Sequence, residues 1–139
     1  MLTEKDYCDY ETCVALMELG FTLDMTEKKY ERNLVCCRYE DVPKPTLYEA
    51  QKFLREEKDI QVSILPFEDY DTDADGNKVG RWVSYAFDLQ WTTSAEWINY
   101  EGHTYDFDTM VAVDTYEEAL SEGIKAAVKL LKGELYERD

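Results

Sequence analysis

The residues whose side chains are best suited to binding a ligand or a metal ion are acidic residues gathered between positions 68 and 77. Residues 71–77 read DTDADGN, in which oxygen ligands alternate before a glycine, as in the first half of a calcium-binding loop. The twelfth position is Trp82, however, and not the bidentate glutamate that such a loop requires. Asp-Gly and Gly-Asn pairs also supply the positive-φ residues of β-hairpins. The pattern therefore favours a hairpin turn. Its weak candidate metal ligands are Asp71, Asp73 and Asp75.

The single histidine, His103, is the other residue that could take part in catalysis. A general base needs an oriented partner and a nearby nucleophile, and the residues around Gly102 and His103 supply neither. Glu117 and Glu118 are neighbours on a predicted helix and point about 100° apart, which does not suit an acid–base pair. No glycine-rich phosphate loop, Gly-x-Ser-x-Gly elbow or His-Glu-x-x-His motif occurs. We therefore expect no enzymatic activity, no catalytic residue and no cofactor.

Four cysteines lie in the first third of the chain, at Cys8, Cys13, Cys36 and Cys37. They form no Cys-x-x-Cys pair, and the N-terminus lacks the basic-then-apolar order of a secretory signal. Buried free thiols are therefore favoured over a disulfide framework, with zinc binding as the alternative. We expect a cytoplasmic protein, and no apolar run approaches the ~18 residues of a membrane span.

The net charge of −16, from 31 acidic and 15 basic residues, limits the partners. It opposes direct binding to nucleic acid or to an anionic membrane, because phosphate contacts need lysine and arginine. Two interpretations stay open at this point. The charge either belongs to a solvated, self-repelling surface, or it mimics nucleic acid and captures basic proteins.

The three tryptophans bracket the predicted second and third strands. Trp91 falls on the predicted core face of residues 81–91 and Trp82 on the opposite face, whereas the pattern does not place Trp97. Aromatic side chains on an uncovered sheet face form contact surfaces for a partner or for a second copy in a homodimer. The alternative is that the N-terminal segment covers this face. The candidate partner-binding residues are Trp82, Trp97, Glu68 and Asp69.

Two capped helices frame the predicted sheet. Thr115 and Glu118, and likewise Thr46 and Glu49, have the capping-box spacing. The later helix carries an apolar stripe before Gly133, and the earlier one ends near residue 58. The stripe consists of Tyr116, Leu120, Ile124, Ala127 and Leu131, and the buried face of the earlier helix of Leu47, Ala50, Phe53 and Leu54.

Between these helices, alternation predicts strands. Ile60, Val62 and Ile64 alternate with polar residues up to Pro66, where we expect the strand to stop. In residues 81–91 the large apolar side chains alternate with smaller ones, which fixes the register. Residues 97–100 and 105–113 are predicted to form a further hairpin around 101–103. Upstream, 10–19 reads as a helix with Cys13, Leu16 and Met17 buried and Gly20 as its stop, and 33–39 as a strand.

The order of elements predicts a single α+β domain over residues 1–139. Its core, residues 43–135, is α-β-β-β-α, an antiparallel sheet of three to five strands with two long helices packed on one face. The N-terminal helix–strand segment, residues 1–42, is expected to extend an edge or cover the second face.

Three stretches together resemble a group of small phage and mobile-element proteins of anaerobic gut bacteria. They are YETCVALMELGF at 10–21, PTLYEAQKFLREEKDIQVSI at 45–64 and DTYEEALSEGIKAAVKLL at 114–131. That group has no established activity, so the resemblance implies an accessory, non-enzymatic protein. The last helix is also weakly similar to that of HicB-type antitoxins, although no DNA-binding segment is evident. We expect a module that binds an unidentified protein; the alternative is an acidic nucleic-acid mimic or antitoxin-like inhibitor of a basic nucleic-acid-binding protein.

Overall fold

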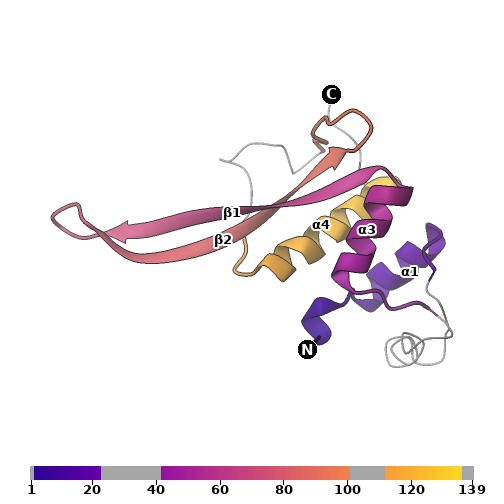
Figure 1. Ribbon diagram of the computed structural model, residues 1–139, viewed down its shortest axis with the longest axis horizontal. Coiled ribbons are helices and arrows are strands. Elements are labelled where there is room, and N and C mark those ends of the chain that lie inside the picture. Colours follow the sequence, from indigo (N-terminus) through magenta and orange to yellow (C-terminus); the bar gives the residue numbers. More distant parts are fainter. Residues whose placement is uncertain (1, 23–41, 101–111, 136–139) are drawn as a thin grey trace.

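The computed structural model describes residues 2–22, 42–100 and 112–135, apart from the side chain of Asp69, and shows an α+β fold (Figure 1). The predicted fold class and antiparallel pairing are thus confirmed. No helix within these residues is long and apolar enough to cross a membrane. The elements in chain order are η1 (Glu4–Asp6), α1 (Tyr10–Glu18), α3 (Leu47–Glu57), β1 (Ile60–Thr72), β2 (Lys78–Trp91) and α4 (Tyr116–Leu131).

The sheet is built on one long antiparallel pair, β1 and β2, that runs from Ile60 opposite Trp91 to Thr72 opposite Lys78. Within the described residues, the other edge of β2 carries two isolated bridges, from Tyr85 to Val113 and from Gln90 to Trp97. The described residues therefore hold fewer regular strands than the three to five predicted, because the third position is a pair of contacts and not a continuous ladder. The predicted strand at 33–39, and 105–111 of the last one, lie outside the described residues.

Strand β1 continues through Pro66, where we had predicted its end. The backbone of Tyr85, which faces Pro66, exchanges both its hydrogen bonds with Val113, at 2.8 and 2.7 Å. Pro66 and Tyr85 are therefore a non-hydrogen-bonded pair of the β1–β2 ladder, so the proline nitrogen faces away from β2. No ladder bond is lost, and the strand tolerates a proline that the sequence alone marks as a stop.

Helix α4 lies against both strands of the sheet. The Thr115 hydroxyl accepts the Glu118 N–H at 3.1 Å, but the return bond of the predicted capping box is not formed between these two residues. Gly133, at φ +78°, ends the helix as expected. Leu120, Ile124 and Ala127 of the predicted stripe are buried, but Tyr116 is 36% exposed and Leu131 is only partly buried. The buried surface instead extends around the helix, because α1 covers α4 on a further side. It comprises Ala119, Leu120, Gly123, Ile124, Ala126, Ala127 and Val128.

Helix α3 packs against β1 and α4 and begins with the predicted reciprocal capping box. The Thr46 hydroxyl accepts the Glu49 N–H at 3.1 Å, and the Glu49 carboxylate accepts the Thr46 N–H at 3.0 Å. Leu47, Ala50 and Leu54 are buried, as predicted for this face. Helices α3 and α4 thus lie on one side of the sheet, as expected (Figure 1).

Helix α1 packs against α4 rather than against the sheet, whereas we had predicted that the N-terminal segment, residues 1–42, would extend an edge of the sheet or cover its second face. Gly20, at φ +103°, ends it and lets the Phe21 N–H return to the Leu16 carbonyl at 2.9 Å. Met17 was predicted to be buried but is 38% exposed, because the buried face centres on Thr12, Cys13, Ala15 and Leu16.

The two described cysteines, Cys8 and Cys13, are buried thiols that form no disulfide with each other, as predicted. Cys36 and Cys37 lie outside the described residues. The segment that carries Cys8 is fixed to the start of α3, since the Cys8 N–H donates to the Pro45 carbonyl at 3.1 Å. Buried Lys44 adds an ion pair to Glu4 at 2.7 Å. These contacts place α1 beside the helices rather than beside the sheet.

Candidate functional site

The distal half of the β1–β2 hairpin projects beyond the helices (Figure 1). We call residues 66–83 the arm. A helix of the length of α4 spans about 24 Å, whereas a strand of the length of β2 spans about 46 Å, so α4 supports only part of the ribbon. Every residue from 71 to 83 is exposed, while Ala86, Asp88 and Leu89, nearer the helices, are buried.

The strand alternation gives the arm two distinct faces. Gly123 of α4 lies against Val62 and Phe87, which identifies the face that continues toward Glu68 and Val83 as the helix side. The register shifts between Tyr70 and Asp71, where Gly80, at φ +68°, is the extra residue of a bulge on β2. The bulge places Val79 on the same face as Trp82. We call that face, opposite to the helix side, the outer face.

The helix side of the arm holds both of its cations. The Arg81 guanidinium donates to the Glu68 carboxylate at 3.1 Å. The Lys78 ammonium donates to the Tyr70 hydroxyl at 2.7 Å and lies 4.0 Å from the centre of the Tyr70 ring. Two basic residues against five acidic ones leave the arm with a formal charge of −3. Its positive charges are therefore already engaged on one face.

The outer face of the arm presents large apolar side chains to solvent. Trp82 is 44% exposed and Val79 is 45% exposed, with partly buried Phe67 nearer the helices. The backbone register sets Asp69 opposite Trp82 and Asp71 opposite Val79. This face thus combines an exposed indole with neighbouring acidic positions, and neither of the arm's cations lies on it.

The tip of the arm is the hairpin turn that the sequence predicted. Gly76 has φ +84°, and one carboxylate oxygen of Asp73 accepts the N–H groups of Asp75 and Asn77, both at 2.9 Å. The bond from Asn77 is the main cause that lowers the pKa of Asp73. In the described part of the chain, no three His, Cys, Asp or Glu side chains are grouped to hold a metal ion. The weak metal candidates Asp71, Asp73 and Asp75 are therefore spread along the tip.

The partner-binding candidates are not gathered into one site. Glu68, Asp69 and Trp82 lie on the arm, but Trp97 bridges Gln90 near the other end of β2. Eight residues of strand between positions 82 and 90 correspond to about 26 Å. His103 lies outside the described residues. The sequence did not single out Val79 as a surface residue; the shift in alternation at Gly80 was the signal that could have revealed it.

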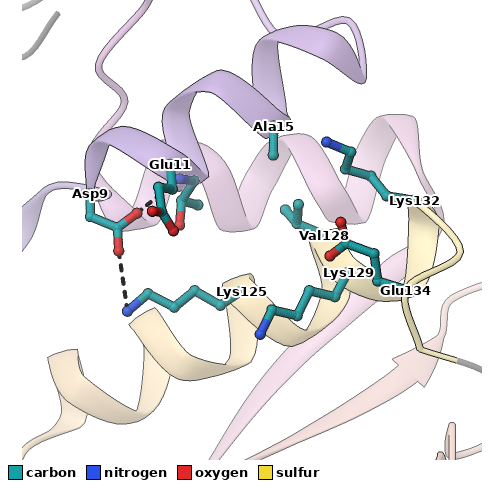
Figure 2. A pocket seen from close by; sticks show the side chains of 9 residues that line it. Asp9, Glu11, Ala15, Lys125, Val128, Lys129, Lys132 and Glu134 are labelled. Atoms are coloured by element: carbon teal, nitrogen blue, oxygen red, sulfur yellow. Dashed lines mark hydrogen bonds and ion pairs between the residues drawn. The ribbon is translucent and has the colours of Figure 1, made fainter.

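Apart from the arm, the structure has a groove of about 300 Å³ between α1 and α4 (Figure 2). The Lys125 ammonium bonds the Asp9 carboxylate at 3.2 Å, and Lys132 pairs with Glu18 at 3.0 Å. Burial alone would raise the pKa of Asp9, but its bonds from Thr12 and the charge of Lys125 outweigh burial and lower it. Two of the three lysines that line the groove thus form ion pairs that connect α4 with α1.

A buried carboxylate that the sequence did not predict lies on β2 itself, at Asp88. Asp88 is 0% exposed, and its carboxylate accepts the Leu89 N–H at 3.0 Å. Burial and the charges of Asp88 and Glu122 raise the pKa of Tyr100 to about 12. The phenol of Tyr100 therefore stays protonated throughout the physiological range.

No protein-family model, curated protein or solved structure matches this chain.

Proposed function

We propose that this chain is a protein-binding accessory module of the phage or mobile-element type and that the arm is its docking element. The observation that supports this function is the exposed indole of Trp82, at 44%, on a ribbon that extends beyond the helices. Exposing large apolar groups is unfavourable, and burying one in an interface contributes about 1.5–3 kcal/mol. Tryptophan is also among the residues most enriched at interface hot spots.

The ribbon itself supports the same proposal. A two-stranded hairpin without a covering layer is only marginally stable in water. Here the Arg81–Glu68 and Lys78–Tyr70 contacts and the Asp73 turn hold it in register. The arm is therefore organised before any partner arrives, which reduces the conformational entropy lost on binding.

Site-specific photo-crosslinking tests the function. A photoreactive tryptophan analogue, which keeps the indole ring, replaces Trp82 in one variant and Tyr48 in another, because Tyr48 of α3 is a comparable exposed aromatic, at 47%. Each variant is irradiated in a lysate of the source cells, and crosslinked proteins are identified by mass spectrometry. We expect a discrete protein adduct from position 82 and none of that identity from position 48. Equal, unspecific labelling from both positions would refute arm-mediated binding.

The alternative function, an acidic mimic that occupies a nucleic-acid-binding protein, is favoured by the net charge of −16. It predicts that duplex DNA competes with the chain for its partner and that the complex weakens steeply with salt. Adding DNA and 0.5 M salt to the crosslinking reaction separates the two functions. An adduct that DNA does not displace supports docking through the arm, whereas one that both DNA and salt remove supports mimicry of nucleic acid.

A further inference from the structure

We propose that the outer face of the arm recognises an arginine side chain within a basic segment of the partner protein. The inference rests on the proposed function, because it assigns the chemistry of what the arm binds. The occupant we assign is a partner peptide segment that presents arginine next to apolar residues.

The first step is the contrast between Tyr70 and Trp82, the two aromatic residues of the arm besides the partly buried Phe67. Tyr70, on the helix side, is covered by the arm's own Lys78, whose ammonium lies 4.0 Å from the ring centre. Trp82, on the outer face, has no such cation over it in the described part of the chain, since the arm's only other base, Arg81, is paired with Glu68. Indole is the aromatic ring that binds cations best. The outer face therefore has an exposed cation-binding ring and no cation of its own.

The second step is charge. The backbone positions opposite Trp82 and Val79 are Asp69 and Asp71, and Asp71 is exposed. An arginine whose guanidinium stacks on the indole has donors left at its edge for a neighbouring carboxylate. A carboxylate-rich partner would meet like charge here, and so would a second copy of a chain with net charge −16. Charge complementarity thus selects a basic segment over a second copy.

The third step is the apolar part of the face. Val79 is 45% exposed on the same side of the ribbon as Trp82. It offers a contact for an apolar side chain two residues from the arginine, because residues i and i+2 of an extended segment point to the same side. The expected ligand is therefore an extended segment with arginine and an apolar residue on one side.

The test uses blocked synthetic octapeptides of alternating sequence and the full-length chain. One peptide repeats Arg-Ser-Val-Ser, and its comparators replace arginine by citrulline or by glutamate. Citrulline keeps the shape of arginine without its charge. Binding is followed in ¹H–¹⁵N spectra through the backbone amide resonances of the arm, which every variant retains, and through the indole N–H of Trp82 where that residue is present. We expect the arginine peptide to bind at least tenfold more tightly than the citrulline peptide and the glutamate peptide not to bind.

Variants assign the binding to the outer face. Trp82→Ala should lower the affinity for the arginine peptide at least tenfold. Asp71→Asn should lower this affinity two- to fivefold and make it less dependent on salt. Val83→Ala is the matched control, because Val83 is 40% exposed but lies on the helix side; it should leave affinity unchanged. Circular dichroism checks that each variant keeps the fold.

Each other outcome has a defined meaning. Equal binding of the arginine and citrulline peptides, or an equal loss in Val83→Ala and Trp82→Ala, overturns the inference. Self-association that sedimentation detects and Trp82→Ala abolishes overturns it in favour of a second copy. Failure of the arginine peptide to bind, with specific crosslinking from position 82 intact, overturns the inference and leaves the proposed function in place. Loss of that crosslinking removes both.

Discussion

Substituting Gly123 by alanine tests how closely α4 lies on the sheet. A Cβ atom at this position would be 2.5 Å from Cγ1 of Val62 and 3.1 Å from Cβ of Phe87. Val62 is fully buried, and its β-branched side chain is restricted at χ1. Its methyl group therefore cannot easily rotate away from the added Cβ atom. The helix must therefore shift away from the sheet or distort the core.

Two opposing terms determine the size of the effect. Overpacking a well-packed core costs about 1–3 kcal/mol, and the 2.5 Å approach to a stiff side chain points to the upper part of this range. Replacing glycine by alanine inside a helix returns about 1 kcal/mol through helix propensity. We expect Gly123→Ala to lower the free energy of unfolding by about 1–2 kcal/mol.

Urea unfolding followed by circular dichroism measures this loss, as a midpoint lowered by roughly 0.5–1 M for typical m-values. The control is a double-mutant cycle with Val62→Ala, which removes the nearest methyl group. In that background Gly123→Ala should be neutral or stabilising. A Gly123→Ala variant as stable as the parent, or the same loss with and without Val62→Ala, would refute the close packing of α4.

Three further predictions follow from single contacts. Asp9→Ala should lower the free energy of unfolding by about 1–2 kcal/mol, because it removes both a helix cap and the Lys125 pair; Asp9→Asn, which can still cap, should lose less than about 1 kcal/mol in the same urea titration. Since the pKa of Asp9 is lowered from 3.8, its contribution is present above that value and is lost as the pH falls through the lowered pKa; a loss that begins at neutral pH would contradict this assignment. Because the pKa of Tyr100 is raised from 10.0 to about 12, the stabilisation is present below pH 10 and is lost between pH 10 and 12, by at most about 3 kcal/mol; urea midpoints across this range should fall less in Tyr100→Phe than in the parent. Asp73→Ala should speed amide hydrogen exchange at the turn, at Asp75 and the residues up to 77, without changing the global midpoint; unchanged exchange would show that the carboxylate does not hold the turn.

The helix ends and the hairpin tip are the features that the sequence predicted best. Thr46 with Glu49, Gly20 and Gly133 act through contacts within a few residues, and each forms where its spacing indicated. The same is true of the tip, where Asp73 and Gly76 form the turn that the DTDADGN run favoured over a calcium loop. These interactions need no partner from elsewhere in the chain, so the residue types alone are enough to predict them.

The candidate site was predicted only in part. Alternation correctly separated the face of Trp82 from the core face of β2, since a one-residue slip would expose every large side chain. It did not show that β1 continues through Pro66. That continuation is possible because the backbone N–H and C=O of Tyr85, opposite Pro66, bond to Val113 and not to β1. Because the strand was predicted to end at Pro66, the sequence did not predict a projecting arm. Trp82 and Trp97 were therefore both named as partner-binding candidates, although the structure places them far apart.

What the sequence by itself determined is therefore the local order: where helices begin and end, where the hairpin turns and which residues share a strand face. Only the tertiary structure decided that α1 packs on α4, that Asp88 is buried and that Trp82 stands on an unsupported ribbon. The physical reason is how far apart along the chain the contacting residues lie. Caps, turns and alternation depend on contacts between near neighbours in the chain, whereas exposure of Trp82 depends on the length of α4 relative to β2, two elements that meet only after folding.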